Sequence, residues 1–164
     1  MSAEYSELVA FRDSLRRMAE GSQDFIARLA VGEGVVAVRN AVNICEKEHI
    51  DNTSLYKRSF HSSEHATHSG NKFRVEFSNN TDYAKHLEYG FRSHFVPGHW
   101  EGKTFVYARN DPHGGMYVGP YKGYVRGRFV FRRAVYRTKN TQDARLKRKM
   151  LQYINWNLRR GGVK

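Results

Sequence analysis

The sequence predicts an α+β fold in which an antiparallel β-sheet packs against a long N-terminal helix and a C-terminal helix. Apolar residues recur with a helical period at both ends of the chain. Residues 72–78 alternate between polar and apolar side chains, as a half-buried strand does. The composition, 40% hydrophobic with 13% aromatic, is sufficient for a packed core. A chain of 164 residues fits one domain. We expect residues 1–140 to form it, with a basic C-terminal helix and tail, 141–164, packed on the same domain.

The first element is predicted to be helical over residues 3–31. Its apolar residues repeat at three- and four-residue steps: Leu8, Phe11, Leu15, Met18, Phe25 and Leu29. Gly21 and Ser22 are expected to interrupt the helix, and Gly32 and Gly34 to weaken it again. The same period then resumes and continues to His49. The segment therefore predicts one long broken helix or two helices joined by a short link.

A β-hairpin is predicted next. The alternation in residues 72–78 places three apolar side chains on one face of the strand, namely Phe73, Val75 and Phe77. Residues 61–68 precede a turn signal at 69–71 and are the expected partner strand.

The middle of the chain predicts a short helix followed by a loop. Polar residues at 79–82 are expected to cap a helix over 83–89, and Gly90 to close it. Residues 91–127 are rich in Gly, Tyr and Pro, so we expect a long loop that contains one strand, 104–108.

The C-terminal part predicts helices over residues 128–138 and 142–160. The second has an apolar stripe that we expect to bury on the protein's own core: Leu146, Met150, Ile154 and Leu158. Trp156 lies off this stripe, which makes it a candidate interface anchor.

Positive charge is concentrated at the C-terminal end. Residues 121–164 contain 14 of the 28 Lys and Arg residues and one of the 16 acids, Asp143. This stretch therefore has a charge of +13 and residues 1–120 a charge of −1, which together give the net +12. Such crowding favours an anionic partner, either nucleic acid or the acidic face of another subunit. The expected contact residues are Arg126, Arg128, Arg132, Arg133, Arg145, Lys147, Arg148 and Lys149.

Catalytic and metal-binding alternatives are less favoured. His61 and His65 would share one face of a strand while His68 points the other way, so their spacing is poor for a metal ion. A nuclease reading of His94, His99 and Glu101 lacks a visible set of metal-binding carboxylates or a positioned base. Acid–base work by Tyr83, His86 and Glu88 is a further alternative, but Glu88 is expected instead to pair with a base or to contact a neighbouring chain.

The glycine-rich segment 114–123 does not end in Gly-Lys-Ser/Thr, so it is no phosphate-binding loop. Its tyrosines could stack on single-stranded bases, but we favour a loop that orders against another subunit. No cofactor or metal is expected. With one cysteine, Cys45, and neither a signal peptide nor a membrane span evident, we expect assembly in the cytoplasm.

Three segments resemble the tail-completion, or head–tail joining, family of long-tailed bacteriophages. Residues 52–60, Asn-Thr-Ser-Leu-Tyr-Lys-Arg-Ser-Phe, resemble the family's T-G-x-L-x-x-S region, with Ser54 where glycine is usual. Residues 83–90, Tyr-Ala-Lys-His-Leu-Glu-Tyr-Gly, resemble its Y-A-x-x-x-E-x-G motif. Phe131-Arg132-Arg133-Ala134 stands in the place of the family's aromatic–Leu–x–x–Ala helix start, although Val130 precedes it where an aromatic is expected. The resemblance spans about residues 35–160.

The resemblance implies a structural virion protein of the neck and no catalysis. Members assemble in the host cytoplasm as oligomeric rings, often hexamers, that complete the tail or join it to the connector and let DNA pass. The implied partners are other copies of the chain, the connector, and tail-tube or tail-terminator proteins, with non-specific DNA contact and no membrane. The residues expected at subunit interfaces are Tyr83, Glu88, Gly90, Tyr117, Tyr121 and Trp156. The alternative is a small basic nucleic-acid-binding module, such as a regulator or RNA-binding protein, and after it a nuclease.

Overall fold

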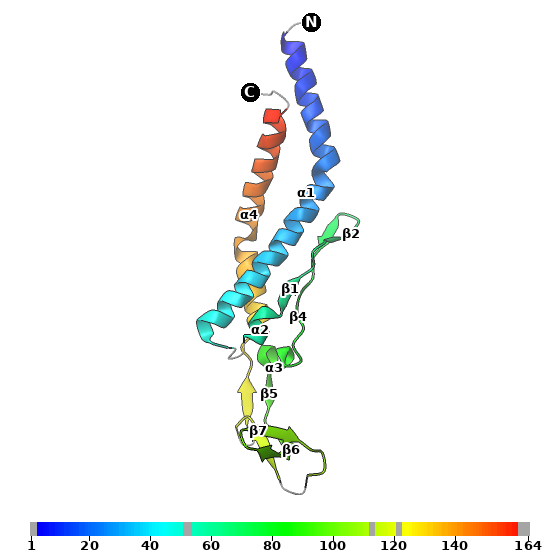
Figure 1. Cartoon of the computed structure of the whole chain (residues 1–164). Helices are drawn as coiled ribbons and strands as arrows, with labels where there is room; N and C mark the ends of the chain where they lie inside the picture. Colours follow the sequence, from blue (N-terminus) through cyan, green and yellow to red (C-terminus); the bar gives the residue numbers. More distant parts are fainter. Residues whose placement is uncertain (1–2, 51–53, 112–113, 121–122, 161–164) are drawn as a thin grey trace. The chain divides into compact units, whose positions relative to one another are not determined.

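The computed structural model describes residues 3–50, 54–111, 114–120 and 123–160 and confirms the α+β class (Figure 1). Two long helices, α1 (Ala3–Glu48) and α4 (Val130–Arg160), accompany short antiparallel strands. The chain forms two compact units, one of Met1–Asn80 with Arg133–Lys164 and one of Thr81–Arg132. Helix α4 runs without a break through residue 140, where the sequence analysis placed the start of the basic C-terminal part. The two helices expected at 128–138 and 142–160 are therefore one.

Helix α1 is unbroken, so the interruptions expected at its glycines do not occur. The glycines instead allow close packing in the first unit. A Cβ on Gly34 would lie 2.6 Å from Val75 Cγ1, and a Cβ on Gly21 would lie 2.9 Å from the Tyr153 hydroxyl. Glycine inside a helix costs about 1 kcal/mol relative to alanine, and here it lets neighbouring elements approach the helix axis.

Helices α1 and α4 lie side by side and antiparallel in the first unit. Tyr153 on α4 stacks on Phe25 of α1, with ring centroids 4.0 Å apart, and its hydroxyl donates to the Met18 carbonyl at 3.1 Å. Near the other end of the pair, Asn40 Nδ2 donates to Thr138 Oγ1 at 2.9 Å. The buried apolar residues of this unit are Leu29, Ala37, Ala41, Ile44, Cys45, Tyr56, Phe60 and Ala134.

The predicted hairpin is present, divided into two short ladders. Strand β1 (Phe60–Ser62) follows the short helix α2 (Leu55–Arg58) and pairs with β4 (Phe77–Asn79). Beyond them β2 (Thr67–Ser69) pairs with β3 (Lys72–Arg74). Phe73 of β3 and Val75 just after it lie on the side of α1, as the alternation in the sequence predicts.

The second unit is mainly β-structure, so the long loop expected over residues 91–127 is wrong. Helix α3 (Ala84–Tyr89) leads into β5 (Gly90–Arg92), which pairs with β9 (Tyr124–Arg126). Strand β6 (His94–Glu101) lies between β7 (Thr104–Tyr107) and β8 (Gly115–Val118). Only β7 was foreseen.

Glycines explain why this region resembles a loop in sequence. A Cβ on Gly98 would lie 2.9 Å from the ring of Phe105, and one on Gly115 would overlap the ring of Phe95. Glycine therefore makes room for aromatic side chains between paired strands. At the start of α3 the N-cap residue is Tyr83, whose side chain makes no capping hydrogen bond, whereas the cap was expected at 79–82.

Candidate functional site

The glutamate of the 83–90 motif caps a helix. Glu88 is 6% exposed, and its carboxylate accepts hydrogen bonds from the backbone N–H groups of Phe131, at 2.8 Å, and Arg132, at 3.0 Å. These two groups belong to the first turn of α4, which has no intrahelical partners for them. A negative charge at a helix N-terminus also interacts favourably with the helix dipole. Within its own unit Glu88 is thus bound to backbone N–H groups rather than to a base.

Two glycines allow this contact. Gly90 has φ +80°, and a Cβ there would lie 2.7 Å from the backbone nitrogen of Gly127. A Cβ on Gly127 would in turn overlap the backbone around Tyr89 and Gly90. The chain entering α4 is held there by the Arg128 N–H, which donates to the Leu87 carbonyl at 2.7 Å. We call the contact of Glu88, Gly90 and Gly127 with the start of α4 the Glu88 joint.

Arg133 and Arg145, both in the predicted cationic contact set, form ion pairs within the first unit. Arg133 binds the Glu48 carboxylate, with Nη1 3.0 Å from Oε2. Arg145 binds Glu33, with Nε 3.1 Å from Oε1, and this hydrogen bond raises the pKa of the guanidinium. The side chains of Arg145 and Glu33 are 18% and 10% exposed. These arginines hold α4 to α1, so we remove both from the contact set.

The other six cations are exposed, except Lys149, which is half-buried: Arg126, Arg128, Arg132, Lys147, Arg148 and Lys149. The last three are consecutive on α4 and point about 100° apart around the helix. They therefore spread positive charge around α4 rather than forming one helix face that could recognise a base sequence.

The predicted interface residues are placed as follows. Tyr117 is exposed on β8 and packs edge-on against Phe95, with centroids 5.4 Å apart. Trp156 is exposed on α4, with the Arg160 guanidinium 5.1 Å above its ring. Tyr83 is partly exposed, Gly90 belongs to the Glu88 joint, and Tyr121 lies outside the described residues.

A histidine–carboxylate cluster is present in the second unit. His99 Nδ1 hydrogen-bonds Asp111, whose side chain is 4% exposed, and Nε2 lies 3.3 Å from Glu101 Oε1. The bond to Asp111 and then that to Glu101 raise the pKa of His99. Sequence reasoning named His99 and Glu101 but missed Asp111, which is 12 residues away and lacked any signal. The cluster joins β6 to the turn that follows β7.

The other histidines have local partners. His61 Nε2 lies 2.9 Å from Ser78 Oγ, and His68 stacks on Phe73 with centroids 4.6 Å apart. The described residues contain no group of three or more His, Cys, Asp or Glu side chains that could hold a metal ion. None of the described helices is long and apolar enough to cross a membrane.

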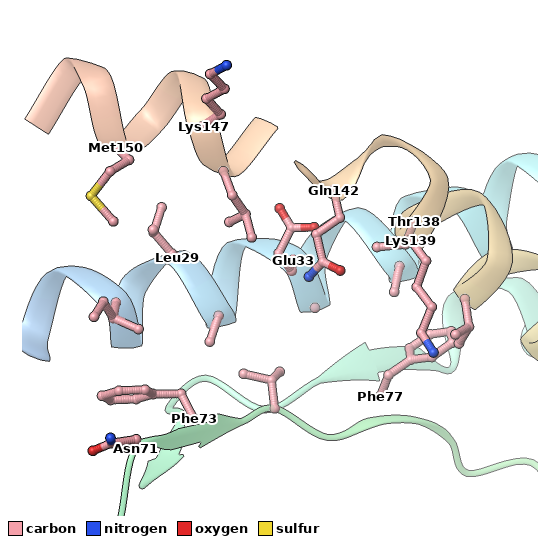
Figure 2. Close-up of a pocket in the computed structure, with 17 residues that line it drawn as sticks. Leu29, Glu33, Asn71, Phe73, Phe77, Thr138, Lys139, Gln142, Lys147 and Met150 are labelled. Atoms are coloured by element: carbon pink, nitrogen blue, oxygen red, sulfur yellow. The ribbon is translucent and has the colours of Figure 1, made fainter. Parts of the chain in front are cut away.

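An open apolar groove of about 710 Å³ lies in the first unit, and sequence analysis did not foresee it (Figure 2). Figure 2 shows α1 running between α4 and the strand that carries Phe73, with Lys139 reaching from α4 toward Phe77. Its apolar lining is Ile26, Leu29, Ala30, Ala37, Phe73, Val75, Phe77, Val135, Leu146 and Met150. The single-face alternation predicted for residues 73, 75 and 77 is therefore confirmed, and it forms one wall of this groove.

Large apolar side chains are widely exposed. Nineteen of those described are at least 36% exposed, whereas the fully buried large side chains include only Tyr56, Ile44 and Val130 among apolar residues of the described chain. Of the predicted C-terminal stripe, Met150 is exposed and Leu146, Ile154 and Leu158 are half-buried, so the stripe is only partly buried. Extended apolar exposure of this kind marks interaction surfaces. Comparison with known proteins finds no matching family, no matching curated protein and no matching solved structure.

Proposed function

We propose that this chain is a structural subunit of the neck of a long-tailed phage, where it forms an oligomeric ring that completes the tail or joins it to the connector. The observation that carries the proposal is the wide exposure of large apolar side chains on both units. A protein that remains alone in solution rarely leaves so many uncovered, and burial between subunits would cover them.

The use of the motif residues supports the same reading. In the resemblance, the glutamate and glycine at positions 88 and 90 are the most recognisable features, and here both build the Glu88 joint. A buried carboxylate that already accepts two backbone N–H groups is an architectural element. This agrees with a protein that works by assembling with partners rather than by catalysis.

The cationic residues of α4 suit contact with DNA or with an acidic protein face. Their spread around the helix favours attraction to phosphates that is independent of sequence and weakens with salt. Such contact would let DNA slide through a ring, whereas dense contacts to base edges would hold it in place.

The ring is tested by measuring mass in solution with light scattering and by negative-stain microscopy. Closed rings of defined mass are expected. A chain that stays monomeric at micromolar concentration, alone and with connector or tail-tube proteins, would overturn the proposal. A monomer or dimer that binds DNA with sequence preference would instead identify the nucleic-acid-binding alternative.

The predicted cationic contact residues are tested with a fourfold glutamine variant at Arg126, Arg132, Lys147 and Arg148, all of which are exposed. Binding to linear duplex DNA is measured at several salt concentrations. Each lost phosphate contact lowers the slope of log K against log salt by about 0.9, so a drop of about 3–4 is expected. The matched control removes four exposed bases elsewhere: Lys72, Lys85, Lys103 and Arg109. An equal loss in both variants would show that net charge alone matters.

A further inference from the structure

The first turns of α1 carry an exposed apolar stripe. Tyr5 is 57% exposed, Leu8 67%, Phe11 43% and Leu15 48%. Their spacing of three and four residues places them on one face of the helix. A solvated helix face of this kind is expected to be covered by a partner in the assembled protein.

This part of α1 is also acidic. Residues 3–11 contain Glu4 and Glu7 and no Lys or Arg, and the first base of the chain is Arg12, which is paired with Asp13. The stripe is therefore an apolar helix face accompanied by negative charge, although the chain as a whole carries +12.

The groove described above has the complementary character. Its walls are apolar, and α4 contributes Lys139 and Lys147 to its lining. Within the described residues neither lysine forms an ion pair, while the acid that lines the groove, Glu33, is already neutralised by Arg145. The groove therefore offers apolar contact together with uncompensated positive charge.

The apolar stripe and the groove are also similar in length. The stripe from Tyr5 to Leu15 is about 15 Å long at 1.5 Å per residue, and the α1 wall of the groove, from Ile26 to Ala37, is about 17 Å long. One helix face laid in an apolar groove is a recurring recognition mode, with anchors at three- and four-residue spacing.

The occupant cannot be the same molecule's own stripe. Tyr5 and Ile26 lie on one continuous helix, which separates them by about 32 Å. An unbroken helix does not fold back on itself, so the stripe can reach a groove only on another molecule.

We propose that the first turns of α1 of one copy occupy the groove between α1, α4 and the β3–β4 arm of a second copy. Stripe and groove are different surfaces, so the contact is heterologous and, repeated, generates a ring or a filament. This inference rests on the proposed function and assigns the contact that joins neighbouring subunits.

Cysteine cross-linking between two separately purified variants tests the contact. Leu8→Cys is mixed with Ile26→Cys, Val135→Cys or Met150→Cys under mild oxidation. The native Cys45 is buried, at 3% exposed, and does not compete. A disulfide joining the two different chains is expected for at least one pair, because bridging requires Cα atoms within about 7 Å. The matched control is Tyr136→Cys, which is 66% exposed on α4 and does not line the groove.

The outcomes separate this contact from the ring itself. Cross-linking of Leu8→Cys alone, in excess of the mixtures, would show stripes packed on each other around a twofold axis and would overturn the inference. Leu8→Asp is expected to dissociate the oligomer at least tenfold more readily than Tyr136→Asp. An intact oligomer that forms no mixed cross-link and tolerates Leu8→Asp would overturn the contact and leave the ring standing. Absence of any oligomer would overturn both.

Discussion

Removing the carboxylate of Glu88 should destabilise the protein by separating α4 from its cap. Glu88→Ala leaves the N–H groups of Phe131 and Arg132 without their acceptor. A hydrogen bond to a charged group contributes about 1.5–3 kcal/mol, and the loss of an N-cap costs about 1 kcal/mol. The two bonds share one carboxylate, and water can reach the exposed Arg132, so their contributions do not add fully. We expect a loss of about 3 kcal/mol for Glu88→Ala and about half of that for Glu88→Gln, which retains one acceptor oxygen.

Thermal unfolding followed by circular dichroism measures the effect. For a chain of this length 1 kcal/mol corresponds to about 2–4 °C, so Glu88→Ala should lower Tm by about 6–12 °C. The matched control is Glu46→Ala, which removes an acid from the exposed ion pair with Lys57, 3.2 Å long. Such surface pairs contribute less than about 1 kcal/mol. Equal shifts for the Glu88 and Glu46 variants would refute the assignment of Glu88 as the cap of α4.

Three further predictions concern other parts of the chain. Gly90→Ala should cost more than about 1 kcal/mol in urea unfolding, because alanine is strained at φ +80° and its Cβ would meet the backbone of Gly127; an unchanged midpoint would contradict this. Arg145→Met should cost about 3–5 kcal/mol by leaving Glu33 buried and unpaired, and adding Glu33→Gln should recover much of it; no recovery in the double variant would count against a pairwise effect. His99 has a raised folded pKa, so its contribution to stability is full below the unfolded pKa of about 6.5 and is lost as pH rises through the folded pKa. Asp111→Asn should return the pKa of His99 toward its ordinary value in an NMR titration, and an unaltered titration would refute the role of Asp111.

Local periodicity made the helices and the hairpin predictable. The apolar repeats located both long helices, and the alternation at Phe73, Val75 and Phe77 correctly gave one face of a strand. The errors came from glycine. Gly34 was expected to weaken α1, whereas it allows a strand to approach the helix, and a property of neighbours distant in sequence leaves no local signal.

The candidate surfaces were predictable only in part. Charge counting identified the cationic C-terminal end, but it could not show that Arg133 and Arg145 are engaged by Glu48 and Glu33, because those acids lie about 85 and 112 residues away in the chain. Glu88 was singled out from the motif, but its bonds to Phe131 and Arg132 were not foreseen, because those residues lie more than 40 positions away in the chain. The groove joins three separate segments, so no single stretch of sequence contains it.

Because α1 is one unbroken helix, a small tilt near its middle moves its N-terminal end by a large distance. From Gly34 to Tyr5 the helix extends about 44 Å, so a tilt of 10° where it meets the strands would displace its N-terminal end by about 8 Å. A larger side chain at position 34, facing Val75, would therefore act at a distance. It would shift the position of the N-terminal end of α1 before it reduced the stability of the fold.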